Sequence, residues 1–277
     1  MRVVRTRAEL RDALSAAARP VGLVPTMGWL HDGHRSLMQR ARADNPTRIA
    51  TIFVNPRQFN EAADFQQYPR DEARDLAICE EEGLDLVFAP SVEEVYPEGF
   101  DTLVTVGAVS RPLEGAARPG HFDGVATVVA ILFNLVGAEH AYFGQKDAQQ
   151  VMVIRQMARD LAIPTEVLAC PTVREPDGLA LSSRNVHLSP EQRTAAAVLY
   201  RALTAGRSRW AAGERSADAL RAAMNRTLAE EPLAEPEYVS VADGRTLAEL
   251  ETVTGPALLS LAVRFGTTRL IDNEPIG

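Results

Sequence analysis

The residues VGLVPTMGWLHDGHRSL, numbered 21–37, predict a strand, a tight turn and a helix in succession. Residues 21–24 form a short apolar run, which is typical of a buried strand. Pro25 and Gly28 end that run, and residues 36–43 have the composition and spacing of a helix. We therefore expect this stretch to be the first repeating unit of a parallel α/β sheet.

The turn contains a pair of histidines, His31 and His34, and the second of them would open the helix. Backbone N–H groups at a helix start have no intrahelical partner, and the helix dipole adds partial positive charge. Such a place suits an anion, most often a phosphate, and Gly28 and Gly33 let a ligand approach the backbone. The alternatives are a tight turn with two surface histidines and, less favoured, a zinc site. The surrounding strand, glycines and helix favour the phosphate site.

Composition and charge argue against several classes of protein. Of 277 residues, 46% are hydrophobic and 24% are charged, as in ordinary soluble proteins. The net charge is 29 − 37 = −8, which argues against non-specific nucleic-acid binding. The longest apolar stretch, residues 125–138, is too short to span a bilayer, and the charged N-terminus does not resemble a signal peptide. Cys79 and Cys170 lie far apart in apolar contexts, which predicts buried reduced thiols in a cytoplasmic protein.

Lys146 is the only lysine among the 29 basic residues of the chain. In a sequence so biased to arginine, one retained lysine indicates a site where a guanidinium does not serve. A compact ammonium on a flexible stem suits a point contact with phosphate. The alternative is a chance remnant, but the neighbouring residues, which follow a predicted strand, favour a functional role.

Further strands and helices alternate along the first part of the chain. Strands are expected at residues 48–54, 84–89, 141–143 and 165–170, and helices at residues 70–82, 123–136 and 148–161. A short strand at residues 103–106 and a polar loop at residues 60–69 are also expected. This alternation predicts a Rossmann-like parallel sheet with helices on both faces.

Polar clusters follow four of these strands, and they read HDGH, NPRQF, GQKD and PTVRE. Ligands of parallel sheets bind outside the carboxyl ends of the strands. The convergence of four clusters at one edge is a stronger argument for a site than any single motif.

The pattern changes near residue 174. We expect a Rossmann-like domain over residues 1–174 and a smaller α+β domain over residues 175–277. Helices at residues 189–212 and 216–230, and strands at residues 238–241, 257–263 and 268–271, are expected in the second domain. Its first loop carries Ser182, Ser183 and Arg184, whose hydroxyl and guanidinium groups suit a phosphate.

A helix start, a single lysine and a Ser-Ser-Arg loop together predict a site for a polyphosphate nucleotide. The sequence has neither a P-loop nor a GxGxxG motif after a strand, so it is not a P-loop protein and a dinucleotide site is unsupported. No Ser/His/Asp or Cys/His arrangement suggests covalent catalysis. Any Mg²⁺ would be held largely by the nucleotide phosphates, with one or two carboxylates helping.

Several motifs resemble the pantoate–β-alanine ligase (pantothenate synthetase) family. They are PTMGWLHDGH, FVNPRQF, RPGHFDGV, FGQKDAQQ, LSSRN and the closing RLIDN at residues 269–273, and they cover nearly the whole chain. HxGH alone is shared with the wider nucleotidylyltransferase group, whereas FVNPxQF with FGxKDxQQ is far more specific. The resemblance implies that ATP and pantoate give pantoyl adenylate and pyrophosphate, and that β-alanine then gives pantothenate and AMP.

The resemblance also implies roles for individual residues. ATP binding is expected at Met27, Gly28, Trp29, Leu30, His31, Asp32, Gly33, His34, Gly144, Gln145, Lys146, Asp147, Val173, Leu181, Ser182, Ser183 and Arg184. Gln58 and Gln150 are expected to bind pantoate, and Gln58 also β-alanine. His31, His34, Lys146 and Arg184 would stabilise charge on the phosphates during adenylation. The second domain would act as a lid, the protein itself would supply no metal site, and a homodimer is expected.

Two other functions remain open at this point. One is another HxGH nucleotidylyltransferase, which transfers a nucleotide to a phosphorylated alcohol or to pantetheine. The other is a non-catalytic nucleotide-binding protein that keeps the fold. Arg118 and His121 in the RPGHFDGV motif have no assigned role, with a phosphate or active-site-loop contact as the hypothesis for Arg118. His140 and His187 are expected to be structural or exposed.

Overall fold

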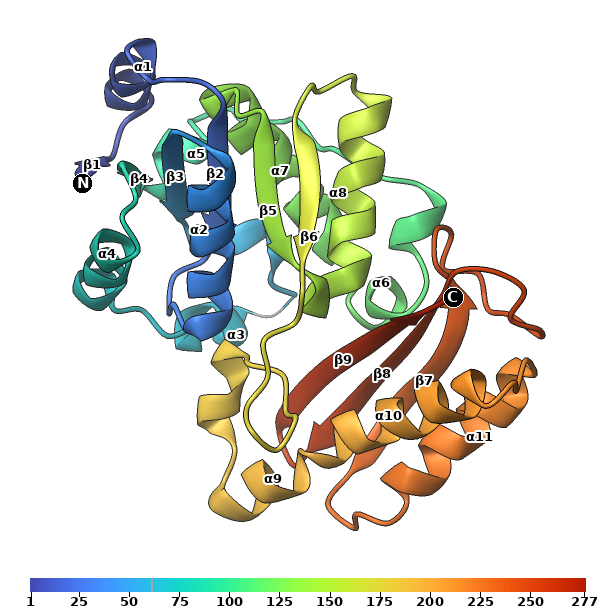
Figure 1. The fold of residues 1–277 in the computed structure, drawn as a ribbon. Coiled ribbons are helices and arrows are strands. Elements are labelled where there is room, and N and C mark those ends of the chain that lie inside the picture. Colours follow the sequence, from blue (N-terminus) through green and yellow to red (C-terminus); the bar gives the residue numbers. More distant parts are fainter. Residues whose placement is uncertain (61) are drawn as a thin grey trace. The chain divides into compact units, whose positions relative to one another are not determined.

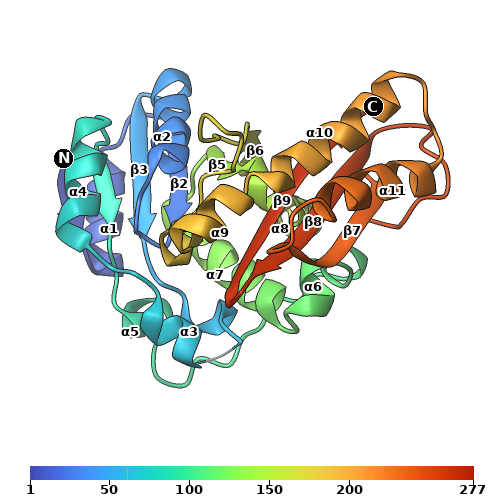
Figure 2. The same cartoon turned by 90° about the horizontal axis from the view of Figure 1, so that it is seen from below.

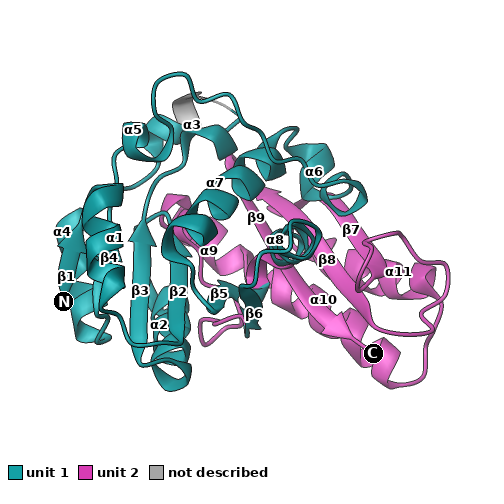
Figure 3. Ribbon diagram, turned by 90° about the horizontal axis from the view of Figure 1, so that it is seen from above, with its two compact units in different colours: residues 1–145, 149–171 teal, residues 146–148, 172–277 magenta. Residues whose placement is uncertain are grey.

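The computed structural model describes residues 1–60 and 62–277, and these form two compact units. The first unit comprises residues 1–145 and 149–171, and the second comprises residues 146–148 and 172–277 (Figure 3). The sequence prediction divided the chain at 174/175 and assigned residues 146–148 to the first domain. Contacts instead group the Lys146 segment with the second unit.

The first unit contains six strands and the helices that connect them (Figure 1). The strands are β1 (Arg2–Val4), β2 (Val21–Thr26), β3 (Thr47–Ile52), β4 (Leu86–Phe88), β5 (His140–Gly144) and β6 (Glu166–Cys170). The helices are α1 (Arg7–Ser15), α2 (Asp32–Asp44), α3 (Ala62–Gln67), α4 (Glu72–Glu81), α5 (Val92–Val95), α6 (Glu114–Ala117), α7 (His121–Val136) and α8 (Ala148–Asp160), and the 3₁₀ turns are η1 (Pro56–Gln58) and η2 (Ala108–Ser110). Residues 146–148, which lie in the turn η3 (Gln145–Asp147) and at the start of α8, group with the second unit.

The six strands pair in the order β1-β4-β3-β2-β5-β6, and every pairing is parallel. Right-handed crossovers between these strands place α2 and α4 on one face and α1, α7 and α8 on the other. Figure 2 shows α2 and α7 on opposite sides of the strands. The predicted Rossmann-like sheet with helices on both faces is therefore confirmed.

The strand order reverses between β2 and β5, because the chain moves outward from β2 through β3 and later returns to β5. In the paired register Leu23 lies opposite Ala141. Three residues further on, Thr26 and Gly144 end their strands at the same level. The loops that follow these two strands therefore leave the sheet together at a topological switch point, where ligands of such sheets bind.

The second unit is a three-stranded antiparallel sheet covered by helices. The strands are β7 (Glu235–Asp243), β8 (Ala257–Phe265) and β9 (Thr268–Ile276), and the helices are α9 (Pro190–Ala195), α10 (Val198–Ala211) and α11 (Ala217–Leu228), preceded by η4 (Ser183–His187). A continuous apolar core joins α10 and α11 to the inner face of this sheet. The predicted helix over residues 189–212 is interrupted after Ala195, so it forms two helices.

Two local predictions in the first unit are wrong. Residues 103–106 form no strand, because the Val104 N–H donates to the Thr127 hydroxyl on α7, 2.9 Å away, and not to a neighbouring strand. The expected loop at residues 60–69 contains α3 over Ala62–Gln67, and Glu61 lies outside the described residues.

The long apolar helix α7 is an interior helix, with twelve of its sixteen residues buried. Among the described helices, none is long and apolar enough to cross a membrane.

Candidate active site

The loop between β2 and α2 presents the His31–His34 pair at the start of a helix. Helix α2 begins at Asp32, two residues before His34, which was expected to open the helix, and His31 is its N-cap residue. The Nδ1 atom of His31 accepts the Gly33 N–H at 3.1 Å, and Nδ1 of His34 accepts the His31 N–H at 3.3 Å. Histidine is not among the usual N-cap residues, which are Ser, Thr, Asp and Asn, so the sequence carries no propensity signal for this cap.

These contacts determine the tautomer of both imidazoles. A ring nitrogen that accepts a backbone N–H carries no proton, so each neutral ring holds its proton on Nε2. The two rings lie 4.2 Å apart between centroids. Both imidazoles therefore lie beside a helix N-terminus, a position that suits phosphate oxygens.

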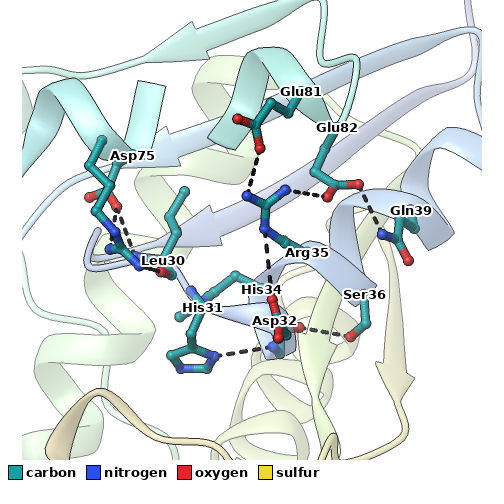
Figure 4. Close-up of polar contacts among 12 residues, drawn as sticks. Leu30, His31, Asp32, His34, Arg35, Ser36, Gln39, Asp75, Glu81 and Glu82 are labelled. Atoms are coloured by element: carbon teal, nitrogen blue, oxygen red, sulfur yellow. Dashed lines mark hydrogen bonds and ion pairs between the residues drawn. The ribbon is translucent and has the colours of Figure 1, made fainter. Parts of the chain in front are cut away.

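A carboxylate that sequence reasoning missed, Asp75 on α4, holds the same loop (Figure 4). Its two oxygens accept the backbone N–H groups of Trp29 and Leu30 at 2.7 and 2.8 Å. Asp75 is only 1% exposed, and this burial raises the pKa of its carboxyl, although the two backbone hydrogen bonds oppose the shift. A signal was present in the sequence, because Asp75 shares the buried i, i+3, i+4 stripe of α4 with Ile78 and Cys79.

Arg35 links the first turn of α2 to the last turn of α4. Its guanidinium donates to Glu81 and Glu82 at 2.7 Å each, and it lies 3.8 Å from Asp32 (Figure 4). The segment that carries the histidines is therefore bound to α4 at both ends. Asp75 of α4 binds residues 29 and 30 before the histidines, and Arg35 after them binds Glu81 and Glu82.

At the end of β3, Gln58 lies in a buried network of amides. Asn55 donates to Oε1 of Gln58 at 2.9 Å, and Tyr96 donates its hydroxyl to Asn55 at 2.7 Å. Nε2 of Gln58 points to Sδ of Met27, 3.0 Å away, so two residues predicted from separate motifs are brought together. Sequence reasoning did not single out Asn55 and Tyr96, whose chemistry shows only in this network.

The RPGHFDGV segment supports the backbone of the same glutamine. The Gln58 carbonyl lies 2.8 Å from Nδ1 of His121, and it accepts from the Arg118 guanidinium at 3.2 Å. Arg118 and His121 also contact each other at 3.2 Å. In the structure these two residues therefore position the Gln58 backbone.

Gly124 on α7 is the point of closest approach between that helix and the Gln58 turn. A methyl group there would lie 2.2 Å from the Arg57 carbonyl oxygen, which is backbone and cannot rotate away. We expect Gly124→Ala to destabilise the fold by about 1–3 kcal/mol and to raise KM for pantoate, which Gln58 is expected to bind. Urea unfolding and steady-state kinetics measure the two effects. The control is Gly255→Ala, where an added methyl group meets no atom within 4 Å, and equal behaviour of the two variants would contradict the prediction.

The predicted residues after β5 divide between the two units. Gly144, Gln145 and Gln150 belong to the first unit, and Gln150 is half-buried on α8. Its neighbour Gln149 is buried and structural, because its side chain bonds the Glu114 N–H and the Pro112 carbonyl.

Lys146, in contrast, is held by the second unit. Its carbonyl accepts the side-chain amide of Asn273 at 2.8 Å, and its ammonium lies 3.5 Å from the Asp147 carboxylate. Lys146, Ser182 and Asn185 line one small depression of this unit together with Asp272.

The remaining predicted residues form one connected turn in the second unit. Leu181 donates its N–H to the Val173 carbonyl at 3.0 Å, so these two candidates are adjacent. Ser182 caps η4 by accepting the Arg184 N–H at 3.2 Å, and residues 181–184 are all partly exposed.

The other two histidines behave as expected, since His140 bonds Asn45 at 2.7 Å and His187 is exposed. Cys79 and Cys170 are buried free thiols, as predicted.

The parallel sheet, its switch point and the histidine-bearing helix start define a Rossmann-like α/β protein with a helix N-terminus suited to a phosphate. The chain matches the pantoate-beta-alanine ligase family over residues 2–275, and it belongs to that family.

Individual relatives agree with this assignment. The pantothenate synthetase of Roseiflexus sp. (strain RS-1) is 63% identical over 273 residues, which cover 99% of this chain and 98% of that protein. A crystal structure of pantoate-beta-alanine (pantothenate synthetase) from Thermus thermophilus has a TM-score of 0.95 and 53% identity, with 99% of each chain covered. A pantoate-beta-alanine ligase from Francisella tularensis, complexed with beta-gamma ATP and beta-alanine, has a TM-score of 0.81 and 33% identity over 99% of this chain and 97% of that chain.

Proposed function

We propose that this protein is an ATP-dependent, AMP-forming ligase that joins pantoate to β-alanine and produces pantothenate. The observation that carries the proposal is the pair of imidazoles at the N-terminus of α2, whose Nδ1 atoms each accept a backbone N–H group, at the switch point of the sheet. The family match over residues 2–275 supplies the substrates, and the Francisella relative was crystallised with beta-gamma ATP and beta-alanine.

The reaction has two steps. A pantoate carboxylate oxygen attacks the α-phosphorus of ATP, the bond to the bridging oxygen breaks, and pyrophosphate leaves. The β-alanine amine then attacks the acyl carbon of pantoyl adenylate, AMP leaves, and the amine loses a proton. Negative charge grows on phosphate oxygens in the first step, and fixed N–H donors and cations stabilise it.

His31 and His34 of the first unit, with Lys146 and Arg184 of the second, are the proposed catalytic groups. The other proposed ATP-binding residues are Met27, Gly28, Trp29, Leu30, Asp32, Gly33, Gly144, Gln145, Asp147, Val173, Leu181, Ser182 and Ser183. We also propose that the second unit acts as a lid, which keeps water from the acyl adenylate.

Gln58 and Gln150 are proposed to bind pantoate, and Gln58 also β-alanine. Oε1 of Gln58 is already engaged by Asn55, so its Nε2 is the group offered to a substrate. In the structure Nε2 faces the thioether of Met27, which is a weak acceptor. A pantoate oxygen would replace that contact at little cost.

Mg²⁺ is proposed to accompany ATP. Within residues 1–60 and 62–277, no group of three His, Cys, Asp or Glu side chains is placed to hold a metal ion. We propose that the ion is held largely by the nucleotide phosphates, with one or two carboxylates helping. The proposed setting is the cytoplasm and the proposed assembly is a homodimer, which light scattering tests.

Pyrophosphate exchange into ATP tests the proposed function. With Mg²⁺ present, we expect exchange that requires pantoate and proceeds without β-alanine, because adenylation is complete before the amine is needed. Exchange that ignores pantoate, or that appears only with a phosphorylated alcohol or pantetheine acceptor, would identify a different HxGH nucleotidylyltransferase. Tight ATP binding with no exchange for any acceptor would indicate a non-catalytic nucleotide-binding protein.

A further inference from the structure

Asp75 lies beneath the backbone of the loop that leads into the histidine pair. It comes from α4, and both of its carboxylate oxygens accept backbone N–H groups, from Trp29 at 2.7 Å and Leu30 at 2.8 Å. The carboxylate is 1% exposed and Leu30 is 0% exposed. If the carboxylate were removed, these two donors would lose their acceptor in an interior where water cannot replace it, which is unfavourable.

The loop has a conformation that needs such support. Trp29 has φ = 51° although it is not glycine, and the preceding Gly28 has φ = 78°. A bulky residue in this left-handed region costs free energy and persists only where the surroundings hold it. A methyl group on Gly28 would lie 2.8 Å from Oδ2 of Asp75, so the loop and the carboxylate are closely fitted.

The preceding residue on α4 closes the other side of the loop. The Arg74 guanidinium donates to the Leu30 carbonyl at 2.8 Å and lies 5.2 Å from the centre of the Trp29 ring. It is also 3.8 Å from Oδ1 of Asp75, so the buried carboxylate has a cation beside it. One turn of α4 thus contacts the N–H and the carbonyl of Leu30, the residue directly before His31.

We propose that Asp75 is a positioning residue for adenylation, which sets the place and angle of His31 and His34 without touching substrate. The direction of the chain at residues 29 and 30 determines where α2 begins, and both imidazoles are fixed to the first turn of α2. The proposal rests on the proposed function for its kinetic consequence, but the conformation of the loop can be measured without any substrate.

Trp29 supplies that independent measurement, because the chain has only two tryptophans. In a Trp210→Phe background, Trp29 is the only indole, and its fluorescence and acrylamide quenching report on the loop. We expect Asp75→Asn to increase the quenching of Trp29 and to lower kcat for pantoate-dependent pyrophosphate exchange by about 10²-fold, since small displacements of reacting groups have effects of that size. In the complete ligase reaction, KM for β-alanine should stay unchanged.

Asp85→Asn is the matched control, because Asp85 also accepts a backbone N–H, from Arg48 at 2.8 Å, but it precedes β4 at the amino ends of the strands, away from the histidine loop. We expect it to alter neither quenching nor kcat. Two results would overturn the proposal. In one, Asp75→Asn behaves like this control in both measurements; in the other, it loses exchange while the quenching of Trp29 is unchanged. If Asp75→Asn does not fold, Arg74→Gln removes the guanidinium from the same loop and is expected to shift both measurements in the same direction. If the unmutated protein shows no exchange, the proposed function is refuted. The role of Asp75 in holding the loop is then tested by the quenching of Trp29 alone.

Discussion

Replacing Lys146 with arginine is expected to leave the protein folded and to lower pantoate-dependent pyrophosphate exchange by about 10²–10³-fold, the usual effect of losing one donor to a charge that develops in the transition state. The substitution keeps the positive charge. What changes is its form, because a planar guanidinium replaces a compact ammonium that can turn its three donors toward one phosphate oxygen.

The surroundings of Lys146 leave little room for the larger group. Its side chain is 18% exposed, and its backbone is held by the amide of Asn273. The bond from Asn273 restrains the main chain at residue 146, and the small depression that Lys146 lines with Ser182 and Asn185 offers a planar guanidinium no added space.

The measurements are the exchange rate at saturating ATP and the midpoint of urea unfolding. Arg226→Lys is the matched control, since it makes the reverse exchange of charged groups at an exposed position on α11. It should change neither quantity. If Lys146→Arg turns over near the unmutated rate, position 146 does not require an ammonium, and the single lysine among the arginines is a chance remnant.

The parallel sheet could be predicted from the sequence because each of its central strands has a local signal. Residues such as Val21–Thr26 are apolar on both sides and are followed at once by a turn, as strands buried under helices on two faces must be. The polar clusters at the ends of β2, β3 and β5 could be predicted for the same reason, since a parallel sheet brings its carboxyl ends to one edge.

What could not be predicted depends on contacts between distant parts of the chain. Asp75 lies on the buried stripe of α4, but the sequence does not show that its partners are the backbone N–H groups of residues 29 and 30. The early start of α2 depends on imidazole nitrogens acting as caps, which no propensity anticipates. The grouping of Lys146 with the second unit depends on Asn273, 127 residues away.

The absence of a strand at residues 103–106 has a different origin. There a local pattern favoured a strand, and a specific contact prevailed over it. Val104 gives its N–H to the Thr127 hydroxyl, a bond that a strand would have used for pairing.

The largest effect on stability is expected at the buried ion pair between Arg174 and Asp272 in the second unit. The guanidinium donates to both carboxylate oxygens, at 2.6 and 3.0 Å, and lies 4.2 Å from the centre of the Tyr200 ring. The side chains are 15% and 1% exposed. Removing one member of such a pair leaves an uncompensated charge in the interior, so Arg174→Met should cost about 3–5 kcal/mol in the free energy of unfolding at neutral pH.

The pH dependence of that loss follows from the carboxyl that remains. Burial raises the pKa of Asp272, and Arg174 opposes that shift. Without Arg174 the folded-state pKa of Asp272 rises further above the unfolded value of about 3.9. A carboxyl whose pKa is raised on folding lowers the free energy of unfolding progressively as pH rises, because it ionises more readily in the unfolded chain. The difference in the free energy of unfolding between Arg174→Met and the unmutated protein should therefore be smaller at pH 5 than at pH 8.

Urea unfolding of Arg174→Met, Asp272→Leu and the double variant at both pH values measures this coupling. We expect the double variant to recover much of the loss, because it leaves neither charge unpaired, and to show no widening gap between pH 5 and pH 8. A double variant as unstable as the sum of the two single variants would show that the ion pair is not the source of the effect. Because Asp272 directly precedes Asn273, which holds the Lys146 carbonyl, recovery of stability in the double variant without recovery of pyrophosphate exchange would mean that the same pair also keeps the Lys146 segment in place.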